Sequence, residues 1–392
     1  MAQNSWLRIA ALLYLIFLTR LTMDLYLPSL ADIQEEFGTT VSKVKLTMSL
    51  YMVGFGISTM TSGILAKRYS KKNVLLVSVG AYVVISLLCS QTRSIDNLII
   101  YRFLLGLTAG AGTVLGRLIV DKDFSDYGKI KVLSYMSTVA AVSPALLPML
   151  GGMINDVYGW RSVFYLITSA GVVGFIAIQM NLKKMHVQKS FQIKETFNNF
   201  RLLIKNKTFL FLMSINSAVW ALLFIYANSS TFIFQEVYNL TASEYSKYFA
   251  CSAIGYALGS FVVRFYAKNF ALEKIMIIIS IITLITSSIL LITSYKTEIT
   301  PNMYTAFYFV ILMSCGVCMP SCQALSLRHF KYCSSDALSL HFFIQLVSVA
   351  TLSVVINSFN FDMQKMLITT TFILSVAIFL ALLKVRSIIA KD

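Results

Sequence analysis

Long apolar stretches recur along the chain, and short polar or charged segments separate each stretch from the next. Each stretch is about 20 residues long, which is the length that a helix needs to cross a bilayer. The pattern predicts an all-α integral membrane protein with twelve transmembrane helices. The expected spans lie at about 7–27, 46–66, 74–91, 97–117, 132–154, 162–182, 208–228, 246–266, 275–295, 304–324, 337–357 and 366–385.

The composition leads to the same class of protein. Of the 392 residues, 57% are hydrophobic and 13% are charged, and the mean hydropathy is +0.74. Soluble domains are about 45–50% apolar and about 25% charged, so this chain cannot cover itself with a polar surface. Twelve spans leave no room for a soluble catalytic domain, and no HExxH motif or Ser/His/Asp set is present. We expect neither an enzyme nor a bound cofactor.

Positive charge is distributed unevenly between the two sides of the predicted membrane. With the N-terminus inside, and with residues at the ends of spans counted in the adjoining segment, 24 of the 33 lysines and arginines fall in inner segments, 7 in outer loops and 2 well within spans. Such an excess marks the cytoplasmic side, so both termini are predicted to be cytoplasmic. The net charge of +16 is therefore mostly a property of the topology and faces anionic lipid, and no nucleic acid partner is expected.

A long basic segment divides the chain into two parts of similar length. The sequence G-x-x-x-x-R ends a span in each part, at 63–68 and at 259–264. Two parallel halves are typical of secondary transporters, whose substrate site lies between the halves near the membrane midplane. We expect a six-helix bundle at 1–182, a cytoplasmic linker at 183–207 and a second six-helix bundle at 208–392.

Three ionisable residues fall inside the predicted spans: Arg20, Asp24 and Arg102. Each costs about 2.5–3.5 kcal/mol to insert, so such residues usually have a function. Asp24 lies about one turn before the outer end of its span, where the helix dipole disfavours a carboxylate, so it is no helix cap. Burial favours the neutral, protonated form of Asp24, whereas a nearby arginine favours its ionised form. A reversible proton carrier needs such a balance between the two forms. The alternative is an interfacial aspartate hydrated from outside.

The two arginines each allow two interpretations. Arg102 lies at a depth similar to that of Asp24, so it either pairs with this acid across the bundle or is a structural residue bonded to carbonyl groups. Arg20 precedes Asp24 by four residues on the same helix face. It either keeps Asp24 ionised or extends outward to the interface.

Backbone signals mark two other spans. Pro144, Pro148, Gly151 and Gly152 lie close together in the fifth span, where they are expected to bend the helix at a cavity or hinge. The fourth span carries two G-x-x-x-G motifs within 106–116, which permit close helix contact and do not form a nucleotide-binding loop.

The second half offers neutral polar groups. A mainly apolar cavity with few polar side chains suits small amphipathic or cationic organic molecules. His341 is interpreted as a packing or interfacial residue. Cys315, Cys318 and Cys322 form one helical stripe, which indicates packing, because a metal site needs more ligands. The six cysteines do not resemble a disulfide framework, so no metal or disulfide is expected.

Several segments together resemble the bicyclomycin/chloramphenicol-resistance (Bcr/CflA-type) drug efflux branch of the major facilitator superfamily. The resemblance is specific over about 24–164 and weaker but collinear afterwards. The matching segments are Asp24-Leu-Tyr26-Leu-Pro28, Leu46-Thr-Met-Ser49-x-Tyr51-x-x-Gly54, Tyr101-Arg102-Phe-Leu-Leu-Gly106, Pro144…Pro148-x-x-Gly151-Gly152 and Gly159-Trp160-Arg161-x-x-Phe164.

The resemblance implies a twelve-helix drug/proton antiporter of a bacterial inner membrane that works by alternating access, and we expect a monomer. Lys67 and Ser70 depart from it, because related loops carry an acid and a glycine there, so an acid that would hold the inner gate is absent from this loop. The expected site comprises Asp24, Arg102 and Arg20 for coupling to protons or substrate, Tyr26, Tyr51, Asn216, Trp220 and Gln345 in a substrate cavity, Pro144, Pro148, Gly151 and Gly152 as a hinge, and Gly63 and Arg68 in a gating loop.

The sequence leaves three candidate functions. The first is proton-coupled efflux of small amphipathic compounds. The second is uptake or exchange of a specific metabolite, which Lys67 and Arg20 favour. The third, a membrane enzyme or receptor, requires a polar catalytic cluster that the sequence does not contain.

Overall fold

The computed structural model describes residues 3–182, 193–266, 271–328, 330, 333–358 and 362–389. These residues form helices and no strand, and twelve of the helices have 20 or more residues, one for each predicted span. The all-α membrane fold is therefore confirmed. The twelve helices are α1 (Gln3–Asp24), α3 (Val41–Arg68), α4 (Lys71–Ser90), α5 (Ile95–Asp123), α6 (Asp126–Tyr158), α7 (Trp160–Asn181), α9 (Lys207–Phe232), α10 (Ala242–Tyr266), α11 (Leu272–Lys296), α12 (Pro301–Leu327), α13 (Ser334–Asn357) and α14 (Met363–Ile389).

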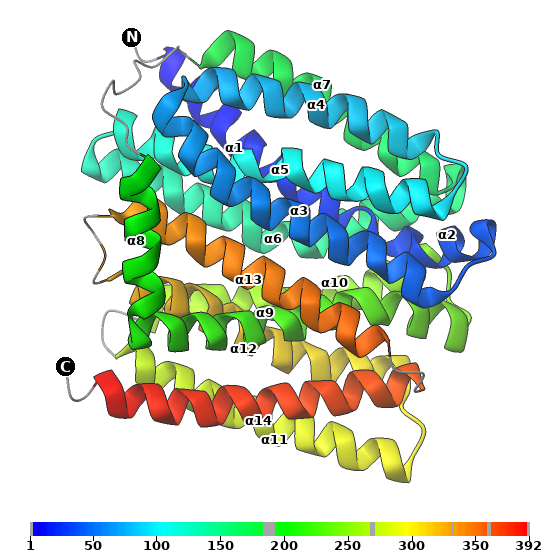
Figure 1. Cartoon of the computed structure of the whole chain (residues 1–392). Helices are drawn as coiled ribbons and strands as arrows, with labels where there is room; N and C mark the ends of the chain where they lie inside the picture. The colour runs from blue at the N-terminus through cyan, green and yellow to red at the C-terminus, as the bar shows by residue number, and fades with distance from the viewer. Residues whose placement is uncertain are drawn as a thin grey trace.

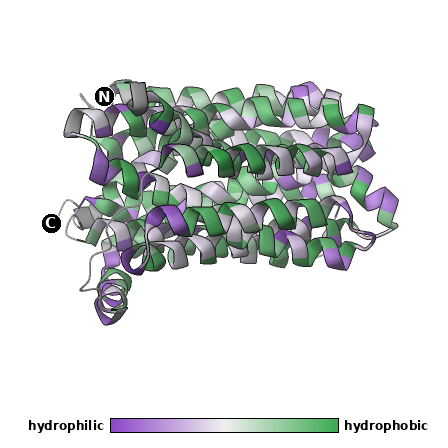
Figure 2. Cartoon of the chain, turned by 90° about the horizontal axis from the view of Figure 1, so that it is seen from above, coloured by the Kyte–Doolittle hydropathy of each residue, from purple (hydrophilic) through white to green (hydrophobic). Residues whose placement is uncertain are grey.

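The outer surface of the bundle is apolar, as a lipid-facing surface must be. Among the described residues, eleven helices are long and apolar enough to cross a membrane, and the twelfth long helix is α10. Hydrophobic residues follow the middle of the helices, whereas hydrophilic residues gather toward the two ends (Figure 2). Large apolar side chains such as Val77, Met180 and Ile278 remain 61–77% exposed on α4, α7 and α11. Their exposure is explained by contact with lipid.

The long helices run side by side, and α1 begins at the same end of the bundle at which α14 ends (Figure 1). We call this end the termini end and the other the opposite end. At the termini end α8 (Ile193–Lys205) lies across the helix ends (Figure 1). Its Phe200 and Leu203 pack with Phe209 and Ala337. This part of the expected linker is thus a docked amphipathic helix, and residues 183–192 lie outside the described part of the chain.

The two halves repeat one way of packing helices. In the first half α3 crosses α5 so closely that a Cβ on Gly54 would lie 2.3 Å from the Phe103 carbonyl oxygen. In the second half α10 crosses α12 equally closely, and a Cβ on Gly255 would lie 2.2 Å from the Phe309 carbonyl oxygen. Only glycine permits such backbone contact, so these pairs account for the close helix packing expected from the sequence. The side chain of Arg264, at the end of the sequence echo, lies outside the described part.

The halves meet along two helix pairs, α3 with α13 and α6 with α10. At the opposite end α6 touches α10 so closely that a Cβ on Gly152 would lie 2.6 Å from the Ala242 carbonyl oxygen. Hydrogen bonds close this end further: Gln235 donates to the Pro28 carbonyl at 2.8 Å, and Thr231 donates to the Leu27 carbonyl at 3.0 Å. We call these contacts the opposite-end seal.

The first span differs in one respect from its prediction. Helix α1 ends at Asp24, and the chain continues through a short 3-10 helix, η1 (Leu27–Ser29), into α2 (Leu30–Phe37). Asp24 is therefore the last residue of α1 and not a residue one turn inside a longer helix. All three segments still belong to one apolar span, Trp6–Phe37. The chain turns at Leu25 and Tyr26, and α1 cannot continue regularly here because Pro28 has no backbone N–H to donate to the Asp24 carbonyl four residues earlier.

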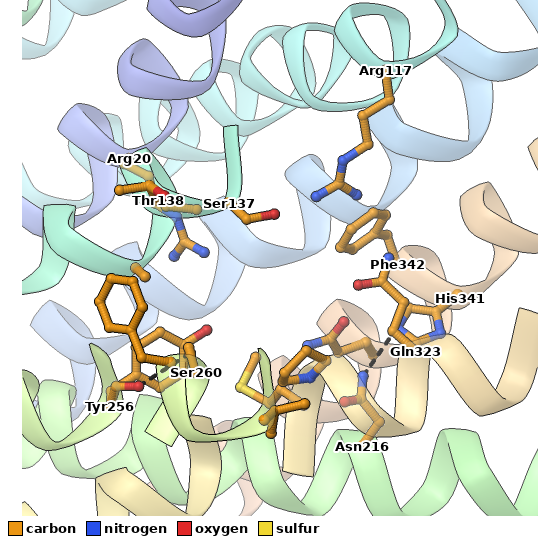
Figure 3. Close-up of a pocket in the computed structure, with 17 residues that line it drawn as sticks. Arg20, Arg117, Ser137, Thr138, Asn216, Tyr256, Ser260, Gln323, His341 and Phe342 are labelled. Atoms are coloured by element: carbon orange, nitrogen blue, oxygen red, sulfur yellow. Dashed lines mark hydrogen bonds between the residues drawn. The ribbon is translucent and has the colours of Figure 1, made fainter. Parts of the chain in front are cut away.

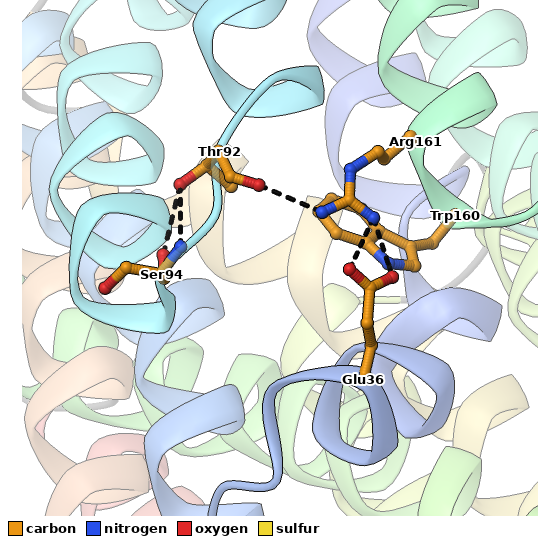
Figure 4. A network of polar contacts seen from close by, with 5 residues as sticks. All are labelled: Glu36, Thr92, Ser94, Trp160 and Arg161. Atoms are coloured by element: carbon orange, nitrogen blue, oxygen red, sulfur yellow. Dashed lines mark hydrogen bonds and ion pairs between the residues drawn. The ribbon is translucent and has the colours of Figure 1, made fainter.

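A polar clamp fixes the first half at the opposite end (Figure 4). The Glu36 carboxylate of α2 accepts hydrogen bonds from the Trp160 indole and the Arg161 guanidinium of α7, both at 2.6 Å. Arg161 also donates to the Thr92 carbonyl, at 3.0 Å, in the turn between α4 and α5. The Gly-Trp-Arg motif thus ties three segments of one half together.

Candidate functional site

A cavity lies between the two halves, on the termini side of the opposite-end seal. It has a volume of about 300 Å³ and continues into a smaller space of about 90 Å³, with which it shares lining residues. Helices α1, α5 and α6 line one side, and α9, α10, α12 and α13 line the other. The cavity occupies the position near the interface of the halves where a transporter binds its substrate.

The first half presents two arginines to this cavity (Figure 3). Arg20 extends from α1 and Arg117 from α5, and both side chains line the larger and the smaller space. The Arg20 guanidinium carbon lies 5.7 Å from the centre of the Trp220 ring, and that of Arg117 lies 5.1 Å from the centre of the Phe342 ring. Among the described residues that line the two spaces, none is an aspartate or glutamate.

The second half presents neutral groups opposite the arginines (Figure 3). The Asn216 amide nitrogen lies 3.0 Å from Nε2 of His341, and Nδ1 of the same imidazole lies 3.4 Å from the Ser326 hydroxyl. Both ring nitrogens of His341 therefore have partners, consistent with its interpretation as a packing residue. Gln345 also lines the cavity, and its Oε1 is buried without a hydrogen-bond partner.

Asp24 lies directly beside the cavity without lining it. Its side chain is 3% exposed, and Oδ2 has no hydrogen-bond partner. Within the described chain, no lysine or arginine nitrogen comes within 4.0 Å of its carboxylate. Arg20, one turn earlier on α1, and Met23, the residue directly before Asp24, both line the smaller space. A buried carboxylate with an unpaired oxygen at this position can exchange a proton when water reaches the cavity.

Arg102 is not directed toward the cavity. It is fully buried, and its guanidinium stacks between the rings of Tyr26 and Tyr51, at 4.2 and 4.4 Å from the ring centres. It donates to the Thr22 carbonyl oxygen at 3.2 Å. These contacts correspond to the structural alternative, an arginine bonded to backbone, although Nε of the guanidinium has no partner. Tyr26, expected in the cavity, instead belongs to this stack.

The other expected site residues fall into three places. Tyr51, Asn216, Trp220 and Gln345 line the cavity. Pro144 and Pro148 lie within α6, which is helical throughout Asp126–Tyr158, and a Cβ on Gly151 would lie 2.2 Å from the Leu25 carbonyl oxygen. Gly63 faces Ser339 of α13, whereas Arg68 is exposed beside Tyr69.

A polar cluster joins the two halves at the termini end. The Lys67 ammonium of α3 lies 2.6 Å from the Asp336 carboxylate of α13 and donates to the Thr196 hydroxyl of α8 at 2.9 Å. Asn199 of α8 donates to the other oxygen of Asp336 at 2.7 Å. The ion pair of this cluster thus has its base on α3 and its acid on α13, whereas related proteins carry an acid in the loop after the corresponding helix. We call these four residues the Lys67 latch.

Two cations that the charge count placed outside the spans, Arg117 and Lys45, lie inside the bundle. Arg117 is the last residue of its expected span, but α5 continues to Asp123, so Arg117 lies inside the bundle. Lys45 was counted in an outer loop, but α3 begins at Val41, and the Lys45 ammonium donates to Ser229 at 3.0 Å within the opposite-end seal. Arg117 ends the apolar window of its span, so the sequence alone gives no signal that it faces the interior.

Comparisons with known proteins agree with this architecture. Residues 12–351 match the family model described as Major Facilitator Superfamily. The chain is 24% identical over 325 residues to the uncharacterized MFS-type transporter YdgK of Bacillus subtilis, which covers 82% of this chain and 81% of that protein. It is 26% identical over 255 residues to the multidrug resistance protein MdtL of Klebsiella pneumoniae, which covers 65% of each chain, slightly less than two thirds.

The fold is also found among solved structures. The D-xylose-proton symporter superposes with a TM-score of 0.75 over 95% of this chain and 97% of that chain, at 11% sequence identity. The efflux-branch resemblance seen in the motifs is confirmed by the relatives. Because the family model spans most of the sequence and the helices have the same arrangement, the chain belongs to the Major Facilitator Superfamily and is a multi-pass membrane transporter.

Proposed function

We propose that this chain exports small amphipathic organic molecules across a bacterial inner membrane in exchange for protons. The observation that carries the proposal is Asp24, a buried carboxylate with an unpaired oxygen beside the cavity between the halves. Buried ionisable groups inside membrane proteins often serve as proton relays. The multidrug resistance name of a relative supports export as the direction.

Alternating access supplies the rest of the mechanism. With the termini end in the cytoplasm, the cavity lies on the cytoplasmic side of the opposite-end seal and loads from there. The two halves then rock about the cavity: the Lys67 latch stays formed while the termini end narrows and the contacts around Gly152 part. Protonation of Asp24 from outside favours release of the substrate, and loss of the proton to the cytoplasm restores the loading state.

The test is transport in inside-out vesicles with an imposed pH gradient. A growth-inhibition panel in an efflux-deficient host, with and without a protonophore, first selects the substrate probe. The wild-type protein should accumulate that probe when a pH gradient is present, and Asp24→Asn should lose this accumulation but keep exchange at equal pH. Asp96→Asn, an exposed acid paired with Lys43, serves as the control and should behave as wild type. Gradient-driven accumulation by Asp24→Asn would refute the role of Asp24.

A second candidate is uptake or exchange of a specific metabolite. The paired guanidinium groups of Arg20 and Arg117 favour it, because two positioned charges give more selectivity than an apolar cavity does. Accumulation driven by an imposed pH gradient separates the two candidates. The antiporter concentrates its substrate and loses this accumulation when a protonophore is added, whereas a facilitator shows counterflow but no accumulation, and a protonophore leaves its rate unchanged.

A further inference from the structure

The charges around the cavity are not balanced by the residues that line it. Arg20 and Arg117 both reach the cavity, and the lining residues in the described part of the chain include no acid. Asp24 lies near Arg20 but outside the 4.0 Å distance of an ion pair. Nη1 of Arg117 is buried and has no hydrogen-bond partner. The site therefore holds at least one cation that nothing in its own lining satisfies.

Such an arrangement is costly unless a ligand completes it. Two guanidinium groups repel each other, and the repulsion grows as water is excluded from the space between the halves. Arg20 and Arg117 are half-buried, and a charge that loses its hydration without gaining a partner is destabilising when the halves close around it. A planar carboxylate can accept parallel hydrogen bonds from a guanidinium fork, which compensates both costs. An ammonium or amidinium group would instead add a third positive charge.

The other hydrogen-bond donors and the aromatic rings around the cavity indicate what the rest of the ligand contains. Trp220 and Tyr51 line the smaller space, and the Trp220 indole nitrogen and the Tyr51 hydroxyl are buried without a hydrogen-bond partner. The Trp220 and Phe342 rings lie beside the two guanidinium groups and offer flat apolar surfaces. The volume of about 300 Å³ fits a small molecule of one or two rings.

We infer that this cavity binds a small organic monoanion, with its carboxylate between Arg20 and Arg117 and its apolar body against Trp220 and Phe342. One bound carboxylate together with Asp24 balances the two guanidinium charges, which favours a monoanion over a phosphate ester of higher charge. The inference rests on the proposed use of this cavity as the transport site. It narrows the substrate class expected from the sequence, because organic cations are excluded.

The test measures binding of three probes that share one aromatic body. 2-Naphthoate, 2-naphthamide and 2-naphthamidine carry charges of −1, 0 and +1. Calorimetric titration of the full-length protein in lipid nanodiscs at pH 7.5 gives each affinity without a pH gradient. Failure of proton coupling would therefore leave the binding result intact. Wild type should bind 2-naphthoate at least tenfold more tightly than either other probe.

Variants then assign the effect to the cavity. Arg117→Gln should weaken 2-naphthoate binding at least tenfold and change 2-naphthamide binding less than twofold, and Arg117→Lys should restore part of the 2-naphthoate affinity. Arg93→Gln removes an exposed arginine in the turn between α4 and α5 as a matched control and should change nothing. Equal binding of the three probes, preference for the amidine, no binding of 2-naphthoate, or equal loss of all probes in Arg117→Gln would each overturn the inference.

Discussion

The two six-helix halves share a packing scheme but differ in the charge that they place near the membrane centre. In both halves a glycine allows two helix backbones to touch, at Gly54 and at Gly255. The first half supplies Arg20, Asp24, Arg102 and Arg117, whereas the cavity side of the second half supplies amides, hydroxyls, aromatic rings and an imidazole. The repeated scaffold thus carries charged groups in one half and neutral polar and aromatic groups in the other.

The largest effect is expected where the two halves touch most closely. A Cβ at position 152 would lie only 2.4–2.9 Å from atoms of Ser246 and Ala242. Gly152→Val would add methyl groups to that Cβ in the same crowded space. Overpacking of this kind costs about 1–3 kcal/mol, and backbone atoms cannot move aside cheaply. Gly152→Val should hold the opposite-end seal open and reduce transport more than tenfold.

The state of the seal can be measured directly. A cysteine at Gln235, in a variant with Cys251 replaced by serine, should react faster with a membrane-impermeant maleimide when Gly152→Val is present. Gly80→Ala is the control, because a Cβ there would meet only Phe175 side-chain atoms at 3.6 Å and more. Unchanged labelling in Gly152→Val would show that the halves do not part at this contact.

The next largest effect is expected at Arg102, a charged residue that stabilises the packing of the first half. Arg102→Gln removes stacking on Tyr26 and Tyr51, and we expect the free energy of unfolding to fall by about 2–4 kcal/mol. Gln345→Ala, in the second half, should cost about 1 kcal/mol or less. Thermal unfolding of the purified proteins in one detergent gives the comparison. Equal shifts of the melting temperature would mean that buried charge does not distinguish the halves.

A smaller effect is expected at the Lys67 latch, where an ion pair connects the halves. Lys67→Asp places two acids together, and Asp336→Lys places two bases together, so each single variant should destabilise the closed gate by about 1–3 kcal/mol. The double variant restores opposite charges and should recover most of the transport rate. A double variant no better than the two single variants would contradict an ionic role for this contact.

The smallest effect is expected at the clamp of the first half. Arg161→Ala breaks the contact with Glu36, but both side chains are about one third or more exposed, so the loss is about 1 kcal/mol or less. The melting temperature should fall slightly, and affinity for 2-naphthoate should not change. A loss of affinity in this variant would mean that the opposite end of the first half acts on the cavity.

The sequence predicts the fold far better than it predicts the site. Hydropathy locates all twelve long helices because lipid contact imposes about 20 apolar residues on each span. Hydropathy places Lys45 and Arg117 outside the spans, because helices α3 and α5 extend beyond the apolar residues that mark each span. It also leaves α8 as an irregular linker, since a helix on the membrane surface has no long apolar run.

The directions of the side chains are the other reason why the sequence predicts the site less well than the fold. Depth along a helix can be counted from the sequence, so Asp24 and Arg102 were expected near each other. The direction in which each side chain leaves its helix depends on packing, and the rings of Tyr26 and Tyr51 hold the guanidinium away from the carboxylate. The polarity of the Lys67 latch was equally hidden, because its partner Asp336 lies 269 residues later in the chain.

The central claim is that Asp24 carries the proton that drives transport. The most direct measurement is proton flux into proteoliposomes containing a pH-sensitive dye, recorded as the selected substrate probe is added at zero membrane potential. The account predicts a proton flux for the wild-type protein and for Asp96→Asn, and none for Asp24→Asn, although Asp24→Asn still binds the probe. An undiminished proton flux in Asp24→Asn would contradict it.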